Sequence, residues 1–246
     1  MKLENKTILI TGANKGLGLA LTQQLLTHNI KKIYATSRNL DNLNDITHPN
    51  ITKLQLDITD PNQITQAASI AADTQILINN AGIITYEDAF EADLQSIHQN
   101  FNTNFFSNLN MIRAFTPILK QNTPAAIINI ASIAAFANFP FIAGYSASKA
   151  ALFSLTQSTR IHLATSNIAV HSVNPGPIDT DMTKNLDMPK TSPTDVANNI
   201  IDALIQDQPD IFPDPTSQHF FSLWNNNYRD LEQAVQEMTT TQPTTN

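Results

Sequence analysis

A tyrosine and a lysine four residues apart, Tyr145 and Lys149, are the pair in this sequence best placed to do chemistry. On a helix, this spacing puts both side chains on one face. A lysine ammonium near a phenol favours the phenolate and lowers a pKa that is otherwise about 10. The pair could therefore give a proton to an oxygen atom or take one from it. Taken separately, each residue type is more often structural than catalytic.

A second pattern, TGANKGLG at residues 11–18, joins a short apolar run to a helical pattern. It holds three of the six glycines in the chain, Gly12, Gly16 and Gly18. A glycine-rich turn between a strand and a helix lets backbone N–H groups approach a pyrophosphate closely. The spacing differs from G-x-G-x-x-G, so the turn alone is also compatible with an ordinary strand-to-helix connection.

Short apolar runs alternate with helical patterns and predict the elements that position these residues. Strands are expected at residues 7–11, 32–37, 51–57, 75–79, 125–131 and 169–174, with a short seventh near 210–212. Helices are expected at 17–26, 61–72, about 94–120, about 145–166 and, after a cap at Ser192, 196–205. The alternation predicts an α/β fold: a Rossmann-type, doubly wound parallel sheet of about seven strands. We expect a single domain over residues 1–238 and a disordered tail over 239–246.

Composition excludes several classes of protein. With 14 Lys and Arg against 21 Asp and Glu, the net charge of −7 argues against nucleic acid as a partner. The chain has no cysteine, so disulfides, thiol nucleophiles and cysteine-ligated metals are absent. The six histidines show no metal-ligand spacing, so no metal site is predicted. No apolar run is long enough for a membrane span, and the apolar stretch at residues 7–10 is too short for a secretory signal. A cytoplasmic protein is expected.

Six motifs in order resemble the short-chain dehydrogenase/reductase family. The first two are the T-G-x-x-x-G-x-G turn and Asn79-Asn80-Ala81-Gly82 after a strand. Asn104 and Ser132 follow at compatible positions. The last two are Tyr145-x-x-x-Lys149 and the stretch NPGPIDT at residues 174–180. Ala131, Ala135 and Ser107 depart from residues common in the family, but none of these changes removes a reacting group.

The resemblance implies a catalytic tetrad of Asn104, Ser132, Tyr145 and Lys149. Tyr145 would act as general acid and base, and the Ser132 hydroxyl would hold the reacting oxygen. Lys149 would also bind the nicotinamide ribose, and Asn104 would hold a water that links Lys149 to solvent. The apolar segments 134–143, with Phe136, Phe139 and Phe141, and 180–189, with Met182, Leu186 and Met188, would wall the substrate site.

The expected cofactor is NADP(H). No carboxylate ends the second expected strand, whereas Arg38 there and Lys15 in the glycine turn could bind a 2′-phosphate. Asp57 resembles the family's adenine contact, although a lone Asp could equally cap the turn before Pro61. The expected cofactor-binding residues are Gly12, Asn14, Lys15, Gly16, Leu17, Gly18, Arg38, Asp57, Ile58, Asn80, Ala81, Gly82, Tyr145, Lys149, Pro175, Gly176, Ile178 and Thr180.

These observations favour an NADP(H)-dependent oxidoreductase that interconverts a small uncharged aldehyde or ketone and its alcohol. Two alternatives stay open: a reductase dedicated to an acyl-carrier-bound ketone, and a dinucleotide-sensing regulator on the same fold. Family members usually pair through two long helices, so a homodimer or homotetramer is expected. Its apolar contacts would include Phe105, Phe106, Met111, Phe115, Leu152, Phe153 and Leu155.

Overall fold

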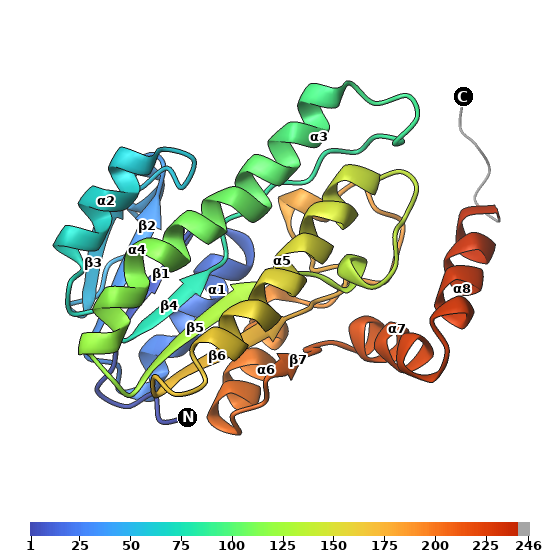
Figure 1. The fold of residues 1–246 in the computed structure, drawn as a ribbon. Helices are drawn as coiled ribbons and strands as arrows, with labels where there is room; N and C mark the ends of the chain where they lie inside the picture. Colours follow the sequence, from blue (N-terminus) through green and yellow to red (C-terminus); the bar gives the residue numbers. More distant parts are fainter. Residues whose placement is uncertain (241–246) are drawn as a thin grey trace.

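The structure, a computed structural model, describes residues 1–240 and places seven parallel strands in one sheet (Figure 1). The strands are β1 (Thr7–Ile10), β2 (Lys32–Ser37), β3 (Ile51–Gln55), β4 (Ile76–Asn79), β5 (Ala125–Ile130), β6 (Ile168–Val173) and β7 (Asp210–Ile211). Their order is β3-β2-β1-β4-β5-β6-β7. This doubly wound Rossmann-type sheet in a single domain confirms the predicted fold, and each strand lies within about two residues of its expected bounds.

Helices cover both faces of the sheet because its strands are apolar on both sides (Figure 1). Helices α1 (Gly16–Leu25) and α6 (Pro193–Ile205) pack on one face. Helices α2 (Pro61–Ile70), α4 (Ser107–Gln121) and α5 (Ala143–His162) cover the other face. In β1, Ile8 and Ile10 pack on the face covered by α1 and α6, whereas Leu9 packs on the opposite face. The predicted Ser192 cap is confirmed: its side chain accepts a hydrogen bond from a backbone N–H of α6.

The helix expected over residues 94–120 is divided into three parts. Helix α3 (Leu94–Phe101) leads into a π-helical turn, η3 (Asn102–Phe106), and α4 follows directly. The apolar pattern does not reveal this turn, since a π-turn changes the helix only locally. Such turns are frequent at functional sites, and Asn104 lies within this one.

Two helices follow β7 at the end of the described chain. They are α7 (Pro215–Asn226), which carries Phe220, Phe221 and Trp224, and α8 (Tyr228–Thr240). Leu231 and Val235 of α8 are buried in a cluster with α7. The disordered tail was expected to begin at residue 239, but residues 239 and 240 are the last two of α8. The rest of that tail, 241–246, lies outside the described residues.

Most of the side chains expected to join subunits are buried or half-buried within this one chain. Met111, Phe115 and Leu152 are fully buried and belong to the interior, which corrects their expected place in an interface. Of the seven residues proposed for this role, Phe106 is the most exposed, at 51%. The expected homodimer or homotetramer stays a prediction.

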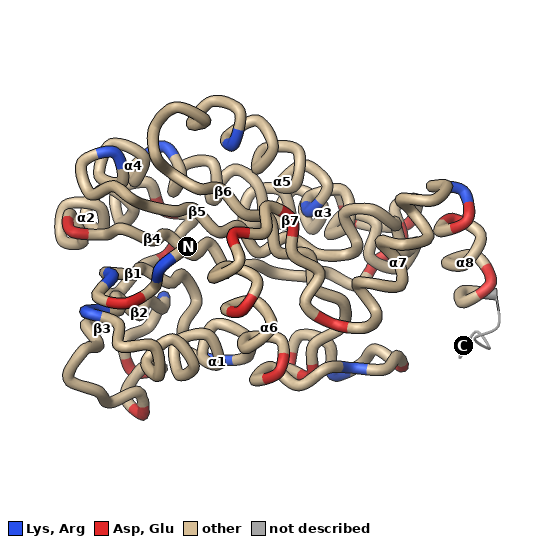
Figure 2. The backbone as a smooth tube through the Cα atoms, turned by 90° about the horizontal axis from the view of Figure 1, so that it is seen from below, with Lys and Arg blue, Asp and Glu red and all other residues tan. Residues whose placement is uncertain are grey.

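Charge is spread over the elements that surround the sheet. Lys and Arg positions lie among Asp and Glu positions in Figure 2. The stretch 94–178, which has no acidic residue, forms α3, α4, β5, α5 and β6. Within residues 1–240, no helix is both long and apolar enough to cross a membrane, and no group of His, Asp and Glu is arranged to hold a metal ion.

A buried chain of amides ties α5 to the middle of the sheet. The Asn79 Nδ2 donates to Asn129 Oδ1 at 2.8 Å, and the Asn129 Nδ2 donates to Thr156 Oγ1 on α5 at 2.9 Å. All three residues are at most 1% exposed. Because buried polar groups must find partners, this chain fixes how α5 sits on β4 and β5.

We expect Asn129→Ala to lower the free energy of unfolding by about 2 to 4 kcal/mol, because it leaves the Asn79 amide unpaired and opens a cavity. Urea unfolding measures the loss. Asn110→Ala, on the exposed face of α4, is the matched control and should change stability by less than about 0.5 kcal/mol. Equal effects of the two substitutions would show that the chain does not hold α5.

Candidate active site

Many of the expected site residues follow the carboxyl ends of β1, β4, β5 and β6. In open parallel sheets, ligands bind at this edge, near the point where the strand order reverses. The turn at residues 11–18 follows β1, Asn80 to Gly82 follow β4, and Ser132 follows β5. The stretch 174–180 follows β6. The sheet topology therefore brings four of the six motifs to one edge.

The glycine turn is folded back on itself so tightly that side chains are excluded. Gly12 and Gly16 have positive φ angles of 65° and 53°. A Cβ on Gly18 would lie 2.0 Å from the Gly12 carbonyl oxygen. Asn80 holds the turn, because its Nδ2 donates to the carbonyls of Thr11 and Gly12 at 2.9 and 3.1 Å.

Helix α1 begins inside this turn and has no side-chain cap at Lys15. Its first backbone N–H groups therefore point toward the turn, and the helix dipole favours an anion there. The narrow glycine backbone and the uncapped helix end fit a pyrophosphate. On these observations, the residues present suit a nicotinamide dinucleotide.

Tyr145 and Lys149 lie on α5, as their spacing predicts. Lys149 is 4% exposed, and its Nζ donates to the Ile130 carbonyl at 2.7 Å. The same Nζ lies 5.7 Å from the centroid of the Tyr145 ring. The Ser132 hydroxyl accepts from the Ala134 N–H at 3.1 Å, and Ser132 and Tyr145 line the same cavity. Three of the four expected catalytic residues thus meet in one place.

The expected lowering of the Tyr145 pKa is wrong for this structure. Burial raises the pKa of Tyr145 to about 12, and the hydrogen bond from Ser132 offsets only part of that rise. Burial also lowers the pKa of Lys149 to about 8. Desolvation therefore outweighs the attraction between the two groups, because the lysine hydrogen-bonds to a backbone carbonyl rather than to the phenol.

Asn104 holds the backbone next to the lysine. Its Oδ1 accepts from the Ile83 N–H at 2.9 Å, while its Nδ2 donates to the Ile83 carbonyl at 2.9 Å and to Ser148 Oγ at 2.9 Å. A Cβ on Gly82 would lie 3.0 Å from Asn104 Oδ1 and 3.5 Å from Lys149 Nζ. Asn104 and Lys149 are therefore brought together around Gly82, and the water expected on Asn104 stays a prediction.

The stretch 174–180 is held by Asp214, a residue that was not expected from the sequence. Asp214, 1% exposed, accepts from the Gly176 N–H at 2.8 Å with Oδ2 and from the Ser217 N–H at 2.9 Å with Oδ1. It is the N-cap of α7 in a capping box. The sequence Asp214-Pro-Thr-Ser217 carries a cap signal, but nothing in it indicates the contact with Gly176. Thr180, further along, packs against Gly16.

The residues expected around the adenosine end have different surroundings. Lys15 forms an exposed ion pair with Asp181 at 3.3 Å, so it reaches toward residues 180–183. The Arg38 side chain is exposed, and the structure gives it no bond within the described chain. Asp57 Oδ1 accepts from the N–H and hydroxyl of Thr59, so it caps the turn before α2, whereas Ile58 is buried in the core.

An apolar cavity of about 60 Å³ adjoins Tyr145 and Ser132. Most of the expected wall is present, but Phe136 is not part of it. Its ring packs instead against Phe153, Phe212, Phe221 and Trp224. The lining residues are Ile84, Ser132, Ile133, Ala134, Phe139, Phe141, Ile142, Tyr145, Gly176, Pro177, Met182, Thr183, Leu186, Met188 and Phe220. Ile84, Ile133 and Phe220 were not expected from the sequence.

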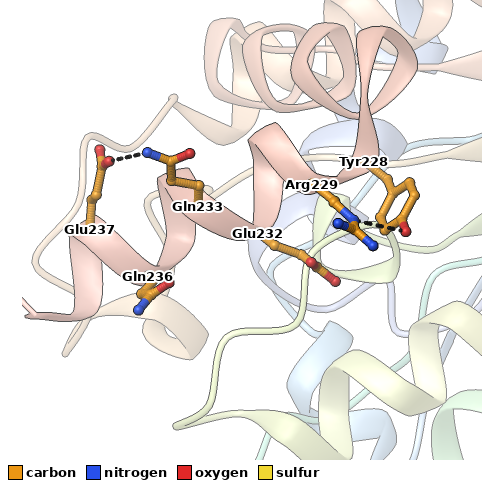
Figure 3. A pocket seen from close by; sticks show the side chains of 6 residues that line it. All are labelled: Tyr228, Arg229, Glu232, Gln233, Gln236 and Glu237. Atoms are coloured by element: carbon orange, nitrogen blue, oxygen red, sulfur yellow. Dashed lines mark hydrogen bonds between the residues drawn. The ribbon is translucent and has the colours of Figure 1, made fainter.

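A second hollow, of about 680 Å³, lies along α8 (Figure 3). Its lining residues are Tyr228, Arg229, Glu232, Gln233, Gln236 and Glu237. All six come from one helix, and the hydrogen bonds between them run along its surface, from Arg229 to Tyr228 and from Gln233 to Glu237. This open polar surface shares no residue with the site around Tyr145.

Known proteins resemble this chain over most of its length. A solved short chain dehydrogenase from Burkholderia cenocepacia, in complex with NADP, is 35% identical to this chain with a TM-score of 0.92. The match covers 99% of this chain and 100% of that one. A structure from Burkholderia phymatum, in complex with NAD, is 22% identical with a TM-score of 0.81, over 94% of this chain and 97% of that one.

Curated relatives agree with this likeness. The 3-oxoacyl-[acyl-carrier-protein] reductase FabG of Buchnera aphidicola is 32% identical over 78% of this chain and 81% of its own. The short-chain dehydrogenase VirD of Hypocrea virens is 33% identical over 75% of this chain and 66% of its own. The sequence pattern of the short chain dehydrogenase family matches residues 6–191. The chain therefore belongs to the short-chain dehydrogenase/reductase family of nicotinamide-dependent oxidoreductases.

Proposed function

We propose that this protein is an NADP(H)-dependent oxidoreductase that interconverts a small uncharged aldehyde or ketone and its alcohol. One observation carries the proposal: the Tyr145 and Ser132 side chains both line the apolar cavity, with the buried Lys149 close to the Tyr145 ring. A carbonyl group in this cavity would have two hydroxyl groups to hydrogen-bond with and an apolar wall around its substituents.

Each side chain has a role that follows from its contacts. When bound, NADP(H) supplies or accepts a hydride at the carbonyl carbon. The Ser132 hydroxyl holds the carbonyl oxygen, and Tyr145 donates its proton to that oxygen as negative charge develops there. In the direction of oxidation, Tyr145 takes the same proton back. Lys149 keeps a positive charge near the phenol, which stabilises the phenolate.

The cavity lining supports the proposed substrate class. Most of its walls are aliphatic or aromatic, and none of its lining residues carries a charged side chain. A charged group on the substrate would lose its hydration without gaining a partner, at a cost of several kcal/mol. We therefore propose an uncharged carbonyl compound rather than a sugar phosphate.

The choice of NADP(H) has support from a solved relative and from charge. The structure from Burkholderia cenocepacia binds NADP, although the one from Burkholderia phymatum binds NAD. In this chain, β2 ends at Ser37 and is followed by the exposed Arg38, without a carboxylate that would repel a 2′-phosphate. A guanidinium at this position could make a two-pronged contact with that phosphate.

The likeness to FabG favours a second candidate, a ketone carried on an acyl carrier protein. The two candidates differ in what must reach the cavity, because a carrier delivers its acyl group on a long thioester arm. Assays with NADPH can distinguish the two candidates, with simple ketones as one set of substrates and a 3-oxoacyl thioester of N-acetylcysteamine as the other. Turnover confined to the thioester would favour the second candidate.

Replacing Tyr145 by Phe should lower kcat for ketone or aldehyde reduction by about 100-fold or more, because the proton donor is lost while the ring packing is kept. NADPH absorbance measures turnover, and NADPH fluorescence measures binding, which we expect to be nearly unchanged. Tyr228→Phe, on α8, is the matched control and should leave turnover unchanged. Near-normal turnover by Tyr145→Phe would refute the proposed role of this residue.

We expect kcat/KM for NADPH in the reduction to fall above about pH 8. Tyr145 stays protonated up to about pH 12, so it sets no limit there, whereas Lys149 loses its charge as the pH rises through about 8. This parameter reports the pKa values of the free enzyme. In Lys149→Met, activity should be low and the fall near pH 8 should disappear. A fall near pH 8 that survives in this variant would assign it to another group.

Arg38→Ala should weaken NADPH binding by about tenfold to a hundredfold, because a charge-assisted hydrogen bond contributes roughly 1.5 to 3 kcal/mol. NADH lacks the 2′-phosphate and should bind nearly as before. Adding Ser37→Asp should turn the preference toward NADH, since the new carboxylate repels the phosphate and accepts from the ribose. The measurement is the ratio of kcat/KM for the two cofactors. A wild-type preference for NADH, or equal weakening of both, would contradict this role.

A further inference from the structure

The segment 83–87, just after the Gly82 turn, is fixed to the helices beside it. Both backbone groups of Ile83 bond to the Asn104 side chain, at 2.9 Å each. Two residues further on, the Thr85 hydroxyl accepts a hydrogen bond from the Asn100 amide of α3. Both anchoring side chains are completely buried. The start of the segment therefore has little freedom to move.

The far end of the segment is fixed in the same way. Glu87 accepts from the Ser96 hydroxyl and forms an isolated parallel bridge with Ile142. Residues 83, 85 and 87 thus contact the helices or the bridge. Between them, Ile84 lines the cavity, and Tyr86 has a partner on a different segment of the chain.

Tyr86 reaches across to the opposite wall of the cavity. Its hydroxyl donates to the Met182 carbonyl at 2.7 Å, a contact between residues 96 positions apart. Met182 belongs to the short turn η5 (Asp181–Thr183), and both Met182 and Thr183 line the cavity. Burial raises the pKa of Tyr86, which keeps its hydroxyl protonated as a donor.

In the part of the chain that the structure describes, one other long-range side-chain hydrogen bond reaches η5. Within the described chain, the side chains from outside residues 176–192 that hydrogen-bond to residues 180–183 are Tyr86 and Lys15. The Lys15–Asp181 pair spans 3.3 Å between side chains that are 69% and 78% exposed. An exposed ion pair of this kind contributes little. The Tyr86 hydrogen bond, made by a side chain that is 43% exposed, is the shorter of the two ties between η5 and the rest of the site, at 2.7 Å.

With this tie in place, the cavity is too small for most substrates. Its volume of about 60 Å³ has room for roughly four to six water-sized bodies, whereas ligand sites usually measure about 300 Å³ or more. A larger ketone can enter only if the two walls separate. Because residues 83–87 are anchored to buried side chains, η5 is the wall that must move.

We propose that Tyr86 is a specificity-determining residue: by bonding to the Met182 carbonyl it clasps segment 83–87 to η5 and limits how large a carbonyl substrate the site accepts. The inference rests on the proposed function. It goes beyond the four residues of the catalytic set, because Tyr86 acts on the shape of the cavity and leaves the proton transfer to Tyr145.

The first test compares Tyr86→Phe with the wild-type protein on methyl ketones of increasing chain length. Removal of the hydroxyl alone should raise the ratio of kcat/KM for long ketones to that for 2-butanone by about 2- to 10-fold, the effect of one neutral hydrogen bond. If Tyr86 had only a structural role, its replacement would lower kcat/KM for all ketones by the same factor. Tyr228→Phe, which removes a hydroxyl bonded to Arg229 on α8, is the matched control and should leave the ratio unchanged.

The second test needs no turnover. Hydrogen exchange followed by mass spectrometry on residues 179–190 should speed up about 2- to 10-fold in Tyr86→Phe, because the Thr183 and Leu186 amides are bonded within that segment. Tyr228→Phe should exchange there at the wild-type rate. An unchanged ratio with normal turnover, or unchanged exchange, overturns the role of Tyr86 alone. A wild-type protein that reduces no aldehyde or ketone overturns the proposed function, and the specificity role with it.

Discussion

The burial of the Lys149 side chain is the constraint on which the arrangement of the site depends. A lysine that is 4% exposed must have its hydrogen bonds satisfied from within, and the Ile130 carbonyl at 2.7 Å supplies one of them. That contact fixes α5 against the end of β5, and with it the direction of Tyr145. Gly82 follows from the same packing, since a Cβ there would crowd both Lys149 and Asn104. The neighbours of the lysine are thus selected by its need for space and partners.

This arrangement costs stability that the core must offset. With a pKa lowered from 10.5 to about 8, holding Lys149 charged costs on the order of 3 kcal/mol. Because the folded pKa lies below the ordinary value, the cost is complete below about pH 8 and is relieved as the pH rises toward 10.5. A domain with a net stability of about 5 to 15 kcal/mol can bear this. The two apolar layers on the sheet faces are the source of the compensating free energy.

The sequence predicted the sheet well because its strands carry their signal locally. Buried parallel strands are continuous apolar runs, and helix caps such as Ser192 stand at fixed positions. The features it missed depend on contacts between distant residues. The π-turn around Asn104 changes the helical period over only a few residues, the ring of Phe136 could face either side of its loop, and Asp214 contacts Gly176 only in the folded chain. The spacing of Tyr145 and Lys149 likewise indicated their proximity but not their desolvation, which decides the direction of both pKa shifts.

The part of the chain beyond the family match still shapes the site. Residues 6–191 carry all four expected catalytic residues, yet Phe220 of α7 lines the cavity and Asp214 caps α7 while it holds the Gly176 backbone. A Cβ on Gly176 would lie 2.6 Å from Asp214 Oδ1, so the loop and the helix start are fitted to each other. A shift of α7 would therefore move a cavity wall and the loop after β6 together. The reacting groups and the shape of the cavity are thus set by different parts of the chain, and the shape can vary without disturbing the chemistry.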